Sequence, residues 1–331
     1  MDKLVSIIIP CYNGEKFVDR CFASILNQDY SHIQIIVVND GSTDQSEQRI
    51  LAWNERFKNA GMQLVYIFQE NRGPGSATNS GLKAVNGEYL SLLDVDDEFL
   101  ESAISTRVAF LNAHKDIDVV RSNGWYIRKD NKSLFINDDT EKRIDDVFSA
   151  LIEGKTNNWA GSFMVRTSAL FSFYPDREIY QSRYGQNLQF LMPLTYRKKC
   201  GFIDEPQMNY NIQEYSLSHT SDSKIEMEWL LKNGAGYRDI RIHIIKQVVN
   251  DHEEILKYSR MADIAYYRLI LNKAVCLNDK DATKKAYSDL KNVRAITIND
   301  RINYCSVFLP CAVLPLRCIR KLKSILKICT R

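Results

Sequence analysis

The sequence predicts an α/β protein with a mostly parallel central sheet, followed by a helical C-terminal region. Short apolar, β-branched runs alternate with helical patterns through the first hundred residues. This alternation is typical of right-handed βαβ units, which build parallel sheets. From Ile225 to about Val293 only helical patterns remain. A chain of 331 residues with 45% hydrophobic content can bury the core that such a fold requires.

The first strand is expected at Leu4–Ile9, an apolar run typical of a strand that is buried on both faces. Pro10 and the Asn13-Gly14 pair end this run. In the segment Glu15–Gln28 the apolar residues recur at helical spacing. The chain therefore opens with a strand, a polar turn and a helix.

The same alternation continues to residue 93. Ser42, with Gln45 three residues later, resembles a capping box that opens a helix running towards Asn59. A third helix, rich in small residues, is expected at Gly75–Val85. The remaining strands of this region are expected at Gln34–Val38, Leu64–Phe68 and Tyr89–Leu93.

Beyond Phe99 the pattern is less regular. Gly234 and Gly236 are expected to break the helical C-terminal region. These signals predict a domain at 1–220, a helical region at 221–300 and a basic amphipathic tail at 301–331. Short strands are expected at Val119–Arg121, Gly124–Arg128 and Ser133–Ile136, and a helix at Asp145–Ile152.

Composition excludes some functional classes. The net charge is only +3 and no basic stripe precedes the C-terminus, which argues against nucleic-acid binding. The eight cysteines form no C-x-x-C pair and none lies near a histidine at zinc-ligand spacing, so free thiols are expected. The first residues lack the pattern of a signal peptide. A cytoplasmic location, extending to the inner face of the membrane, is therefore expected.

Polar residues follow each of the four N-terminal strands. In parallel sheets ligands bind outside the carboxyl ends of the strands, so these residues are the candidates for a site. They are Pro10-Cys11-Tyr12-Asn13-Gly14, Asn39-Asp40-Gly41-Ser42-Thr43-Asp44, Glu70-Asn71-Arg72-Gly73-Pro74-Gly75 and Asp94-Val95-Asp96-Asp97.

The acidic turn after the fourth strand is the most informative of these. Asp94, Asp96 and Asp97 lie within one turn. Two carboxylates about 5 Å apart repel by about 3 kcal/mol at an effective dielectric constant of about 20. A cation would relieve this repulsion, and oxygen ligands suit Mg²⁺ or Mn²⁺. The alternative is a solvated turn that caps a helix beginning near Phe99.

Two further residues have a structural and a functional interpretation each. Asp40 is either a turn residue or an acceptor for an N–H group of a nucleotide base. Arg72 is either a surface arginine or a planar donor that faces a phosphate or a base. Neither residue by itself shows whether these strand ends bind a nucleotide.

The combination of four motifs in order is more specific than any one of them. Together they strongly resemble family 2 glycosyltransferases of the GT-A fold, over roughly residues 4–100 and more weakly to about Ser218. The motifs are Val-Ser-Ile-Ile-Ile-Pro-Cys-Tyr-Asn-Gly (5–14), Ile-Val-Val-Asn-Asp-Gly-Ser-Thr-Asp (36–44), Glu-Asn-Arg-Gly-Pro-Gly-Ser-Ala-Thr-Asn-Ser-Gly (70–81) and Gly-Glu-Tyr-Leu-Ser-Leu-Leu-Asp-Val-Asp-Asp (87–97).

The resemblance implies an inverting transfer of a hexose from a nucleotide sugar, usually a UDP-sugar, to a glycan or lipid-linked saccharide acceptor. It also implies a D-x-D element that contacts the ribose and a diphosphate-bound metal ion, Mn²⁺ or Mg²⁺. The residues implied for the metal are Asp94, Asp96 and Asp97. Those implied for the nucleotide are Pro10, Tyr12, Asn13, Asp40, Arg72, Gly73 and Asp94.

The chain departs from the family where a general base is expected. Many members carry a Glu-Asp pair ahead of an aromatic residue, whereas Tyr184–Phe190 contains Gln186 and Asn187. Amides do not titrate, so neither can deprotonate an acceptor hydroxyl. The stretch resembles a Gly-Gln-Asn-x-Gln variant of the family. We choose Glu178 as the candidate base, with Asp176, Asp204 and Glu205 as alternatives.

Two features near the C-terminus remain as predictions. His219, in the segment that resembles the end of the GT-A domain, is a candidate to approach the metal or the diphosphate. The run Cys305–Leu316 is too short to span a membrane. Beyond it, basic residues interleave with apolar residues at helical spacing, which is typical either of a helix on an anionic membrane surface or of a packed helix with a solvated face.

Two other functions stay open. A nucleotidyltransferase would also use a D-x-D-like metal site, but it should carry a lysine-bearing glycine-rich loop after the first strand, which Pro10–Gly14 lacks. A non-catalytic nucleotide-sugar-binding protein would explain why amides replace the expected acidic pair.

Overall fold

The computed structural model describes residues 3–129, 131–212 and 223–308. Their contacts divide them into two compact units. The first comprises the residues up to 212 together with Ile240–Ile255, and the second comprises residues 223–239 and 256–308. His219 and the tail from residue 309 onward lie outside the described residues.

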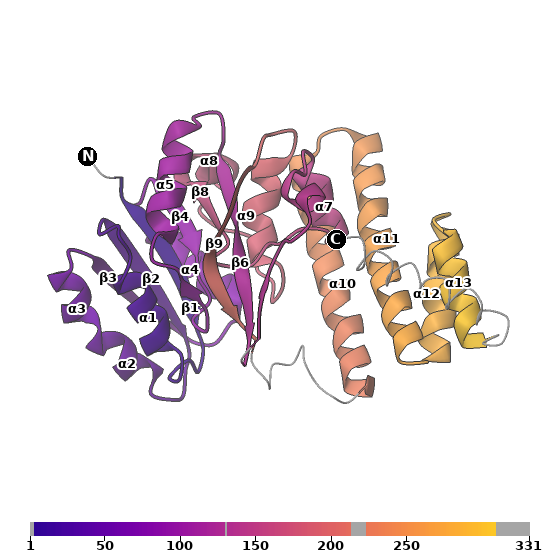
Figure 1. The fold of residues 1–331 in the computed structure, drawn as a ribbon, viewed down its shortest axis with the longest axis horizontal. Helices are drawn as coiled ribbons and strands as arrows, with labels where there is room; N and C mark the ends of the chain where they lie inside the picture. Colours follow the sequence, from indigo (N-terminus) through magenta and orange to yellow (C-terminus); the bar gives the residue numbers. More distant parts are fainter. Residues whose placement is uncertain (1–2, 130, 213–222, 309–331) are drawn as a thin grey trace. The chain divides into compact units, whose positions relative to one another are not determined.

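The first unit is built on a nine-stranded sheet in the order β3-β2-β1-β4-β8-β6-β9-β5, with β7 paired to β6 (Figure 1). Strands β1, β2, β3 and β4 run parallel, as the sequence predicts, whereas β8 lies antiparallel between β4 and β6. The strands are β1 (Val5–Cys11), β2 (Ile33–Asp40), β3 (Gln63–Gln69), β4 (Tyr89–Leu92), β5 (Glu98–Phe99), β6 (Val119–Arg128), β7 (Asn131–Leu134), β8 (Phe163–Arg166) and β9 (Gly201–Asn211).

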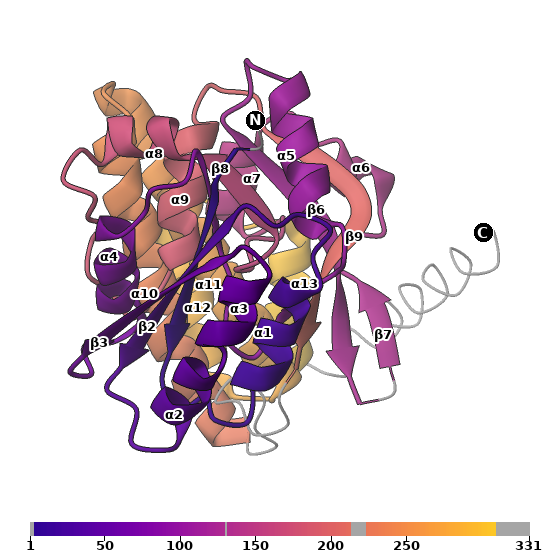
Figure 2. The same cartoon turned by 90° about the vertical axis from the view of Figure 1, so that its left-hand side faces the viewer.

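Helices cover both faces of this sheet (Figures 1 and 2). On one face, the apolar residues of α1, α2, α3 and α5 share one core with alternate residues of β1 and β2, and α5 lies against β6 and β9. On the other face, α4 packs on β1 and β2, and α9 contacts β6. These helices are α1 (Val18–Leu26), α2 (Ser46–Ala52), α3 (Asn54–Asn59), α4 (Pro74–Lys83), α5 (Ala103–Ala113), α6 (Asp139–Lys142), α7 (Val147–Glu153), α8 (Thr167–Phe173) and α9 (Gln186–Thr195).

The four N-terminal strands form where the sequence predicts them. β1, β2 and β4 are apolar runs buried between two helical layers, whereas β3, at the edge of the sheet, is only partly buried. In the less regular region, the two expected strands at 119–121 and 124–128 are one strand, β6. The pairing of β6 with β9 shifts register around Asn123. Such an irregularity interrupts the side-chain alternation from which a strand is predicted.

The predicted capping box at Ser42 is wrong. Helix α2 begins at Ser46, and the Asp44 carboxylate accepts hydrogen bonds from the backbone N–H groups of Glu15 and Ser46. The Ser42 hydroxyl instead accepts a hydrogen bond from the backbone N–H of Asn13, 3.0 Å away. Long-range contacts between two loops have therefore replaced a local cap.

The predicted break at Gly234 and Gly236 is also wrong, because α10 (Ser223–Val248) runs through both glycines. A Cβ atom at Gly234 would lie 3.0 Å from the Tyr266 ring, so the glycine permits close packing of this helix on α11. The other helices of the C-terminal region are α11 (His252–Cys276), α12 (Lys280–Asn292) and α13 (Ile298–Phe308). None of the helices within the described residues combines the length and hydrophobicity that a membrane crossing needs.

Candidate functional site

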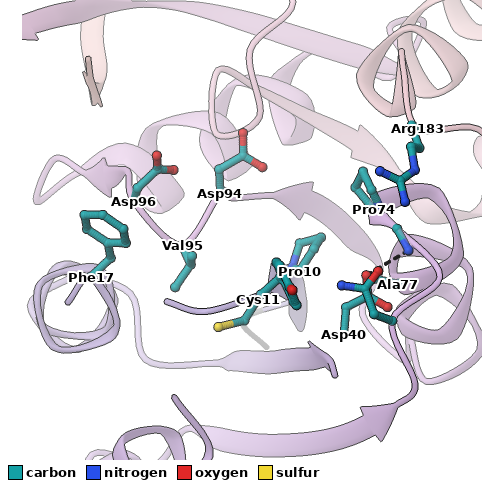
Figure 3. A pocket seen from close by; sticks show the side chains of 13 residues that line it. Pro10, Cys11, Phe17, Asp40, Pro74, Ala77, Asp94, Val95, Asp96 and Arg183 are labelled. Atoms are coloured by element: carbon teal, nitrogen blue, oxygen red, sulfur yellow. Dashed lines mark hydrogen bonds between the residues drawn. The ribbon is translucent and has the colours of Figure 1, made fainter. Parts of the chain in front are cut away.

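A cavity of about 600 Å³ opens at the carboxyl ends of β1, β2 and β4 (Figure 3). This is the sheet edge at which the sequence predicts a site. Its lining contains most of the predicted nucleotide and metal residues, together with several that the sequence analysis did not select. The lining residues are Pro10, Cys11, Tyr12, Phe17, Asp40, Asn71, Gly73, Pro74, Ala77, Asp94, Val95, Asp96 and Arg183.

Asp40 forms part of the cavity wall and is almost saturated with hydrogen bonds. One carboxylate oxygen accepts from the Gln69 amide at 2.6 Å and from the Arg72 backbone N–H at 2.9 Å. The other oxygen accepts from the Gly73 backbone N–H at 2.8 Å. Asp40 is only 3% exposed. Its carboxylate therefore fixes the turn that leads into α4 and keeps little capacity for a further donor.

The loop after β1 is tied to the loop after β2. Asn13 has a φ angle of 50°, and its side-chain oxygen accepts a hydrogen bond from the Thr43 backbone N–H at 2.9 Å. Asn13 does not line the cavity, whereas its neighbour Tyr12 does and is 53% exposed. The structure thus places Asn13 as a link between loops beside the cavity.

The turn that carries Asp94 and Asp96 is held from outside the cavity. The Asp96 backbone carbonyl accepts hydrogen bonds from the Arg20 guanidinium at 2.6 Å and from the Asn211 side-chain amide at 2.9 Å. Within the turn, the Asp97 backbone N–H donates to the Asp94 carbonyl at 3.0 Å. These bonds use the backbone, so the Asp94 and Asp96 carboxylates remain directed towards the cavity (Figure 3).

The three carboxyl groups of the acidic turn have raised pKa values, and burial contributes more to this than the mutual repulsion that the sequence predicts. The Asp94 carboxylate is accessible from the cavity, but protein atoms surround it on its other sides. This desolvation, with a smaller contribution from the charge of Asp96, raises the pKa of Asp94 to about 7. Desolvation also raises the pKa of Asp96, which the positive charge of Arg20 opposes.

Asp97 is oriented differently from the other two aspartates. It is buried, and one of its oxygens accepts a hydrogen bond from the Asn211 backbone N–H at 2.9 Å. Burial, followed by the charges of Asp94 and Asp96, raises the pKa of Asp97 well above its ordinary value. Asp97 does not line the cavity. The structure therefore places it as an anchor between the turn and the end of β9.

Two carboxylates at the cavity suit a particular kind of metal ion. Within the described ranges, no three His, Cys, Asp or Glu side chains are arranged to hold an ion by themselves. Mg²⁺ is commonly bound by one or two carboxylates, with substrate phosphates and water as its other ligands. Asp94 and Asp96 fit an ion that arrives with such a substrate, and they do not fit a closed site made by protein alone.

Arg183 is a lining residue that the sequence analysis did not select. It lies in the loop before α9, more than 80 positions after the last of the four motifs. A Cβ atom at Gly73 would lie 3.5 Å from Cγ of Arg183, so the arginine stem packs over a position that has no side chain. Its place next to the Gly-Gln-Asn stretch was the only signal in the sequence.

A family model decides the classification of this chain. The model for glycosyl transferase family 2 matches residues 6–180, which is more than half of the chain. The chain belongs to glycosyl transferase family 2. The match contains β2 to β4 and all of β1 except Val5, and therefore every strand end that meets at the cavity.

Curated relatives of this family 2 glycosyltransferase are matched over part of their length. An uncharacterized glycosyltransferase of Rickettsia typhi is 38% identical over 138 residues, which are 41% of this chain and 41% of the relative. The minor teichoic acid biosynthesis protein GgaB of Bacillus subtilis is 27% identical over 270 residues. That match covers 80% of this chain and 29% of GgaB.

Solved structures of similar fold cover almost all of this family 2 glycosyltransferase. The first 349 residues of S. aureus TarS, in complex with UDP-GlcNAc, match with a TM-score of 0.57 and 18% identity over 92% of this chain and 90% of that one. The mannosyltransferase PcManGT of Pyrobaculum calidifontis, in complex with GDP-Man and Mn²⁺, matches with a TM-score of 0.55 and 15% identity. This match covers 98% of this chain and 85% of that one. At these identities the likeness shows the GT-A fold that the sequence predicts.

Some of the predicted site residues lie outside the cavity lining. Glu178 is exposed and forms an ion pair with Lys83, in which the two charged atoms are 2.6 Å apart. Gln186 begins α9, and its amide donates to the Ser182 backbone carbonyl at 3.2 Å. Asn187 follows it in the first turn of that helix.

Arg72 is also exposed and outside the lining, and it reaches the site only through its backbone bond to Asp40.

Proposed function

We propose that this chain transfers a hexose from a nucleotide sugar, with UDP-sugars the first choice, to a hydroxyl group of a glycan acceptor. The observation that carries the proposal is the cavity itself, where the carboxylates of Asp94 and Asp96 face the same space as the turn held by Asp40. The bound UDP-GlcNAc of TarS and the GDP-Man and Mn²⁺ of PcManGT support a nucleotide-sugar donor and a divalent ion.

Residues on two sides of the cavity would contact different parts of the donor. Pro10, Tyr12 and the wall formed by Asp40 would hold the nucleoside, and Gly73, over which the stem of Arg183 packs, would lie beside the phosphates. Asp94 and Asp96 would hold Mn²⁺ or Mg²⁺ together with the diphosphate. When bound, such an ion neutralises the negative charge that develops on the departing nucleoside diphosphate.

Transfer with inversion also requires a group that removes the proton of the acceptor hydroxyl. The contacts of Glu178 do not favour this role, because its carboxylate pairs with Lys83 and lies outside the lining. The alternative Asp204 is exposed and pairs with Lys142 at 2.9 Å. The carboxylates of the lining are those of Asp40, Asp94 and Asp96.

The absence of an evident base among the described residues favours one second candidate function. A protein that binds a nucleotide sugar without transferring it would need the same cavity and would tolerate Gln186 and Asn187. We keep this function as the alternative and do not pursue a nucleotidyltransferase, because the described cavity lining has no lysine.

A donor-consumption assay separates the two candidates. UDP-, GDP- and CDP-sugars are incubated with the protein and Mn²⁺, with and without a panel of saccharide acceptors, and release of the nucleoside diphosphate is measured. Acceptor-stimulated release is expected with one donor. If a donor binds in a thermal-shift measurement but stays intact with every acceptor, the binding protein is the better description.

The relation of GgaB to teichoic acid synthesis supports a role in cell-surface polysaccharide synthesis and therefore an acceptor on a lipid carrier. We propose that the protein works in the cytoplasm, with the basic tail touching the inner face of the membrane. Removal of residues 309–331 leaves α13 whole and should move the protein from the membrane fraction to the soluble fraction. An unchanged distribution would exclude the tail as the anchor.

A further inference from the structure

The side chain of Arg183 reaches the cavity without a partner. It is exposed, it lines the cavity, and it makes no hydrogen bond or ion pair with any residue that the structure describes. Other arginines of this unit are engaged, as Arg20 is with the Asp96 carbonyl and Arg177 with the Val85 carbonyl. An arginine held at a cavity with all its donors unused is available to a ligand.

The backbone that leads to Arg183 is fixed by two pairs of hydrogen bonds. Before it, the Asn79 side-chain amide pairs with the Ile179 backbone through two hydrogen bonds, of 2.8 and 2.9 Å. In the same way, the Gln189 amide pairs with the Tyr180 backbone, at 2.8 and 3.0 Å. These two pairs tie the loop to α4 and to α9. The loop therefore presents Arg183 from a fixed position.

Two glycines allow this loop to approach the start of α4. A Cβ atom at Gly75 would lie 2.4 Å from the Ser182 carbonyl oxygen, so only glycine permits the loop to cross there. At Gly73 a Cβ atom would meet the stem of Arg183 only at an ordinary contact distance of 3.5 Å, so this glycine is favoured by its φ angle of 88°. The Gly-Pro-Gly motif thus seats a loop that lies about 110 residues later in the chain.

The charges around the cavity indicate what Arg183 would bind. Among the described lining residues it is the only one with a positive charge, and Asp40, Asp94 and Asp96 are the negative ones. Asp40 is occupied by three N–H donors. Figure 3 shows Arg183 above Pro74, on the side of Asp40 and away from Asp96. A ligand that reaches from the acidic turn to Arg183 needs a cation near the carboxylates and an anionic group near the guanidinium.

We propose that Arg183 binds the diphosphate group of the nucleotide donor and so sets the preference of this site for nucleoside diphosphates over nucleosides. The inference rests on the proposed function, because it assumes that a nucleotide occupies the cavity. A guanidinium group matches phosphate oxygens with two parallel donors, whereas an ammonium group does not. Arg183 is therefore a binding residue that the four motifs do not contain.

The test compares binding of three ligands to four proteins. UDP, GDP, CDP and dTDP are first titrated into the wild-type protein with Mn²⁺ by calorimetry. The diphosphate that binds most tightly, the corresponding monophosphate and the corresponding nucleoside are then the three ligands for all four proteins. The variants are Arg183→Ala, Arg183→Lys and the control Arg301→Ala, which removes the same charge from an exposed position of α13. Thermal unfolding of each variant checks that it is folded.

Arg183→Ala is expected to weaken the diphosphate roughly 10-fold or more, as loss of a charge-assisted hydrogen bond does. Affinity for the nucleoside should change little, and Arg183→Lys should recover part of the loss. In steady-state kinetics the KM for the donor should rise more than kcat falls. Arg301→Ala should bind all three ligands as the wild-type protein does.

Three outcomes overturn the inference in different ways. If the wild-type protein binds none of the four diphosphates, both the proposed function and the inference fail. If it binds one and Arg183→Ala binds that ligand equally well, only the inference fails. If Arg183→Ala loses diphosphate and nucleoside affinity by the same factor, Arg183 contacts the nucleoside and the diphosphate assignment is wrong.

Discussion

Aspartates on the two sides of the cavity differ in what surrounds their carboxylates. Asp40 is buried and accepts three hydrogen bonds, from Gln69, Arg72 and Gly73. The carboxylates of Asp94 and Asp96 face the cavity, and neither accepts a hydrogen bond from the side chain or backbone of another described residue. The first carboxylate is satisfied by the fold, and the other two are left for a ligand. The same side chain therefore supports structure in one place and chemistry in the other.

The largest expected effect is a loss of activity on substitution of Asp96, whose carboxylate accepts no hydrogen bond from another described residue. Asp96→Ala should lower metal-dependent transfer by roughly 100- to 1000-fold, the scale on which loss of one transition-state-stabilising group acts. Stability should change little, because the turn is held through the Asp96 backbone carbonyl rather than through its carboxylate. Transfer rates with Mn²⁺ and urea unfolding measure the two effects. Unchanged transfer would remove Asp96 from the metal site.

Substitution of Asp40, whose carboxylate accepts three hydrogen bonds, should instead lower mainly the stability of the protein. Asp40→Asn places an amide group against the N–H groups of the turn, and an unsatisfied buried donor costs about 1–3 kcal/mol. The free energy of unfolding should fall by that order, with donor binding weakened as a consequence. Asp116→Asn is the matched control, since Asp116 is exposed and its one ion pair among the described residues is with the exposed Lys199. Equal stability of the two variants would contradict the structural role of Asp40.

A glycine substitution tests the wall beside Asp40. Gly75→Ala would place a methyl group 2.4 Å from the Ser182 carbonyl oxygen, and overpacking of this kind costs about 1–3 kcal/mol. The displaced loop should also weaken diphosphate binding through Arg183. Gly61→Ala is the comparison, because no atom lies within 4 Å of its added Cβ and only backbone strain at a φ angle of 77° remains. Calorimetric titration with the nucleoside diphosphate shows whether Gly75→Ala and Gly61→Ala differ in ligand affinity as well as in stability.

The smallest expected effect is a gain in stability. Asp94 has a pKa of about 7 in the folded protein, above the 3.8 of an unperturbed aspartate. Its contribution to stability is therefore fully present at low pH and is lost as the pH rises towards 7. Asp94→Asn should make the metal-free protein modestly more stable at pH 8 and leave it nearly unchanged at pH 4.

Added Mn²⁺ should narrow that difference, because the ion would stabilise the wild-type protein and not the variant. Urea unfolding at both pH values, with and without Mn²⁺, measures the free energy of unfolding of the wild-type protein and of the variant in each condition. A loss of stability in Asp94→Asn at pH 8 would mean that the carboxylate is satisfied in the same way as that of Asp40.

The sequence by itself determined the first four strands, the helices between them and the sheet edge at which polar residues gather. Strands of parallel sheets are locally apolar, and their carboxyl ends meet at one edge, so local patterns carry this information. The D-x-D turn was found in the same way. The long strand β9 and the irregular β6 were not predicted as they are, because their alternation is interrupted where they pair with each other.

Only the tertiary structure decided which side chains of this edge serve the cavity. Asp94, Asp96 and Asp97 are chemically alike in sequence, yet Asn211 from β9 draws Asp97 away from the cavity. The sequence favoured Arg72, which lies in the third motif, but it is Arg183, carried by the loop that crosses Gly75, that lines the cavity. Both choices depend on contacts between segments about 110 residues apart, and no local pattern records such contacts.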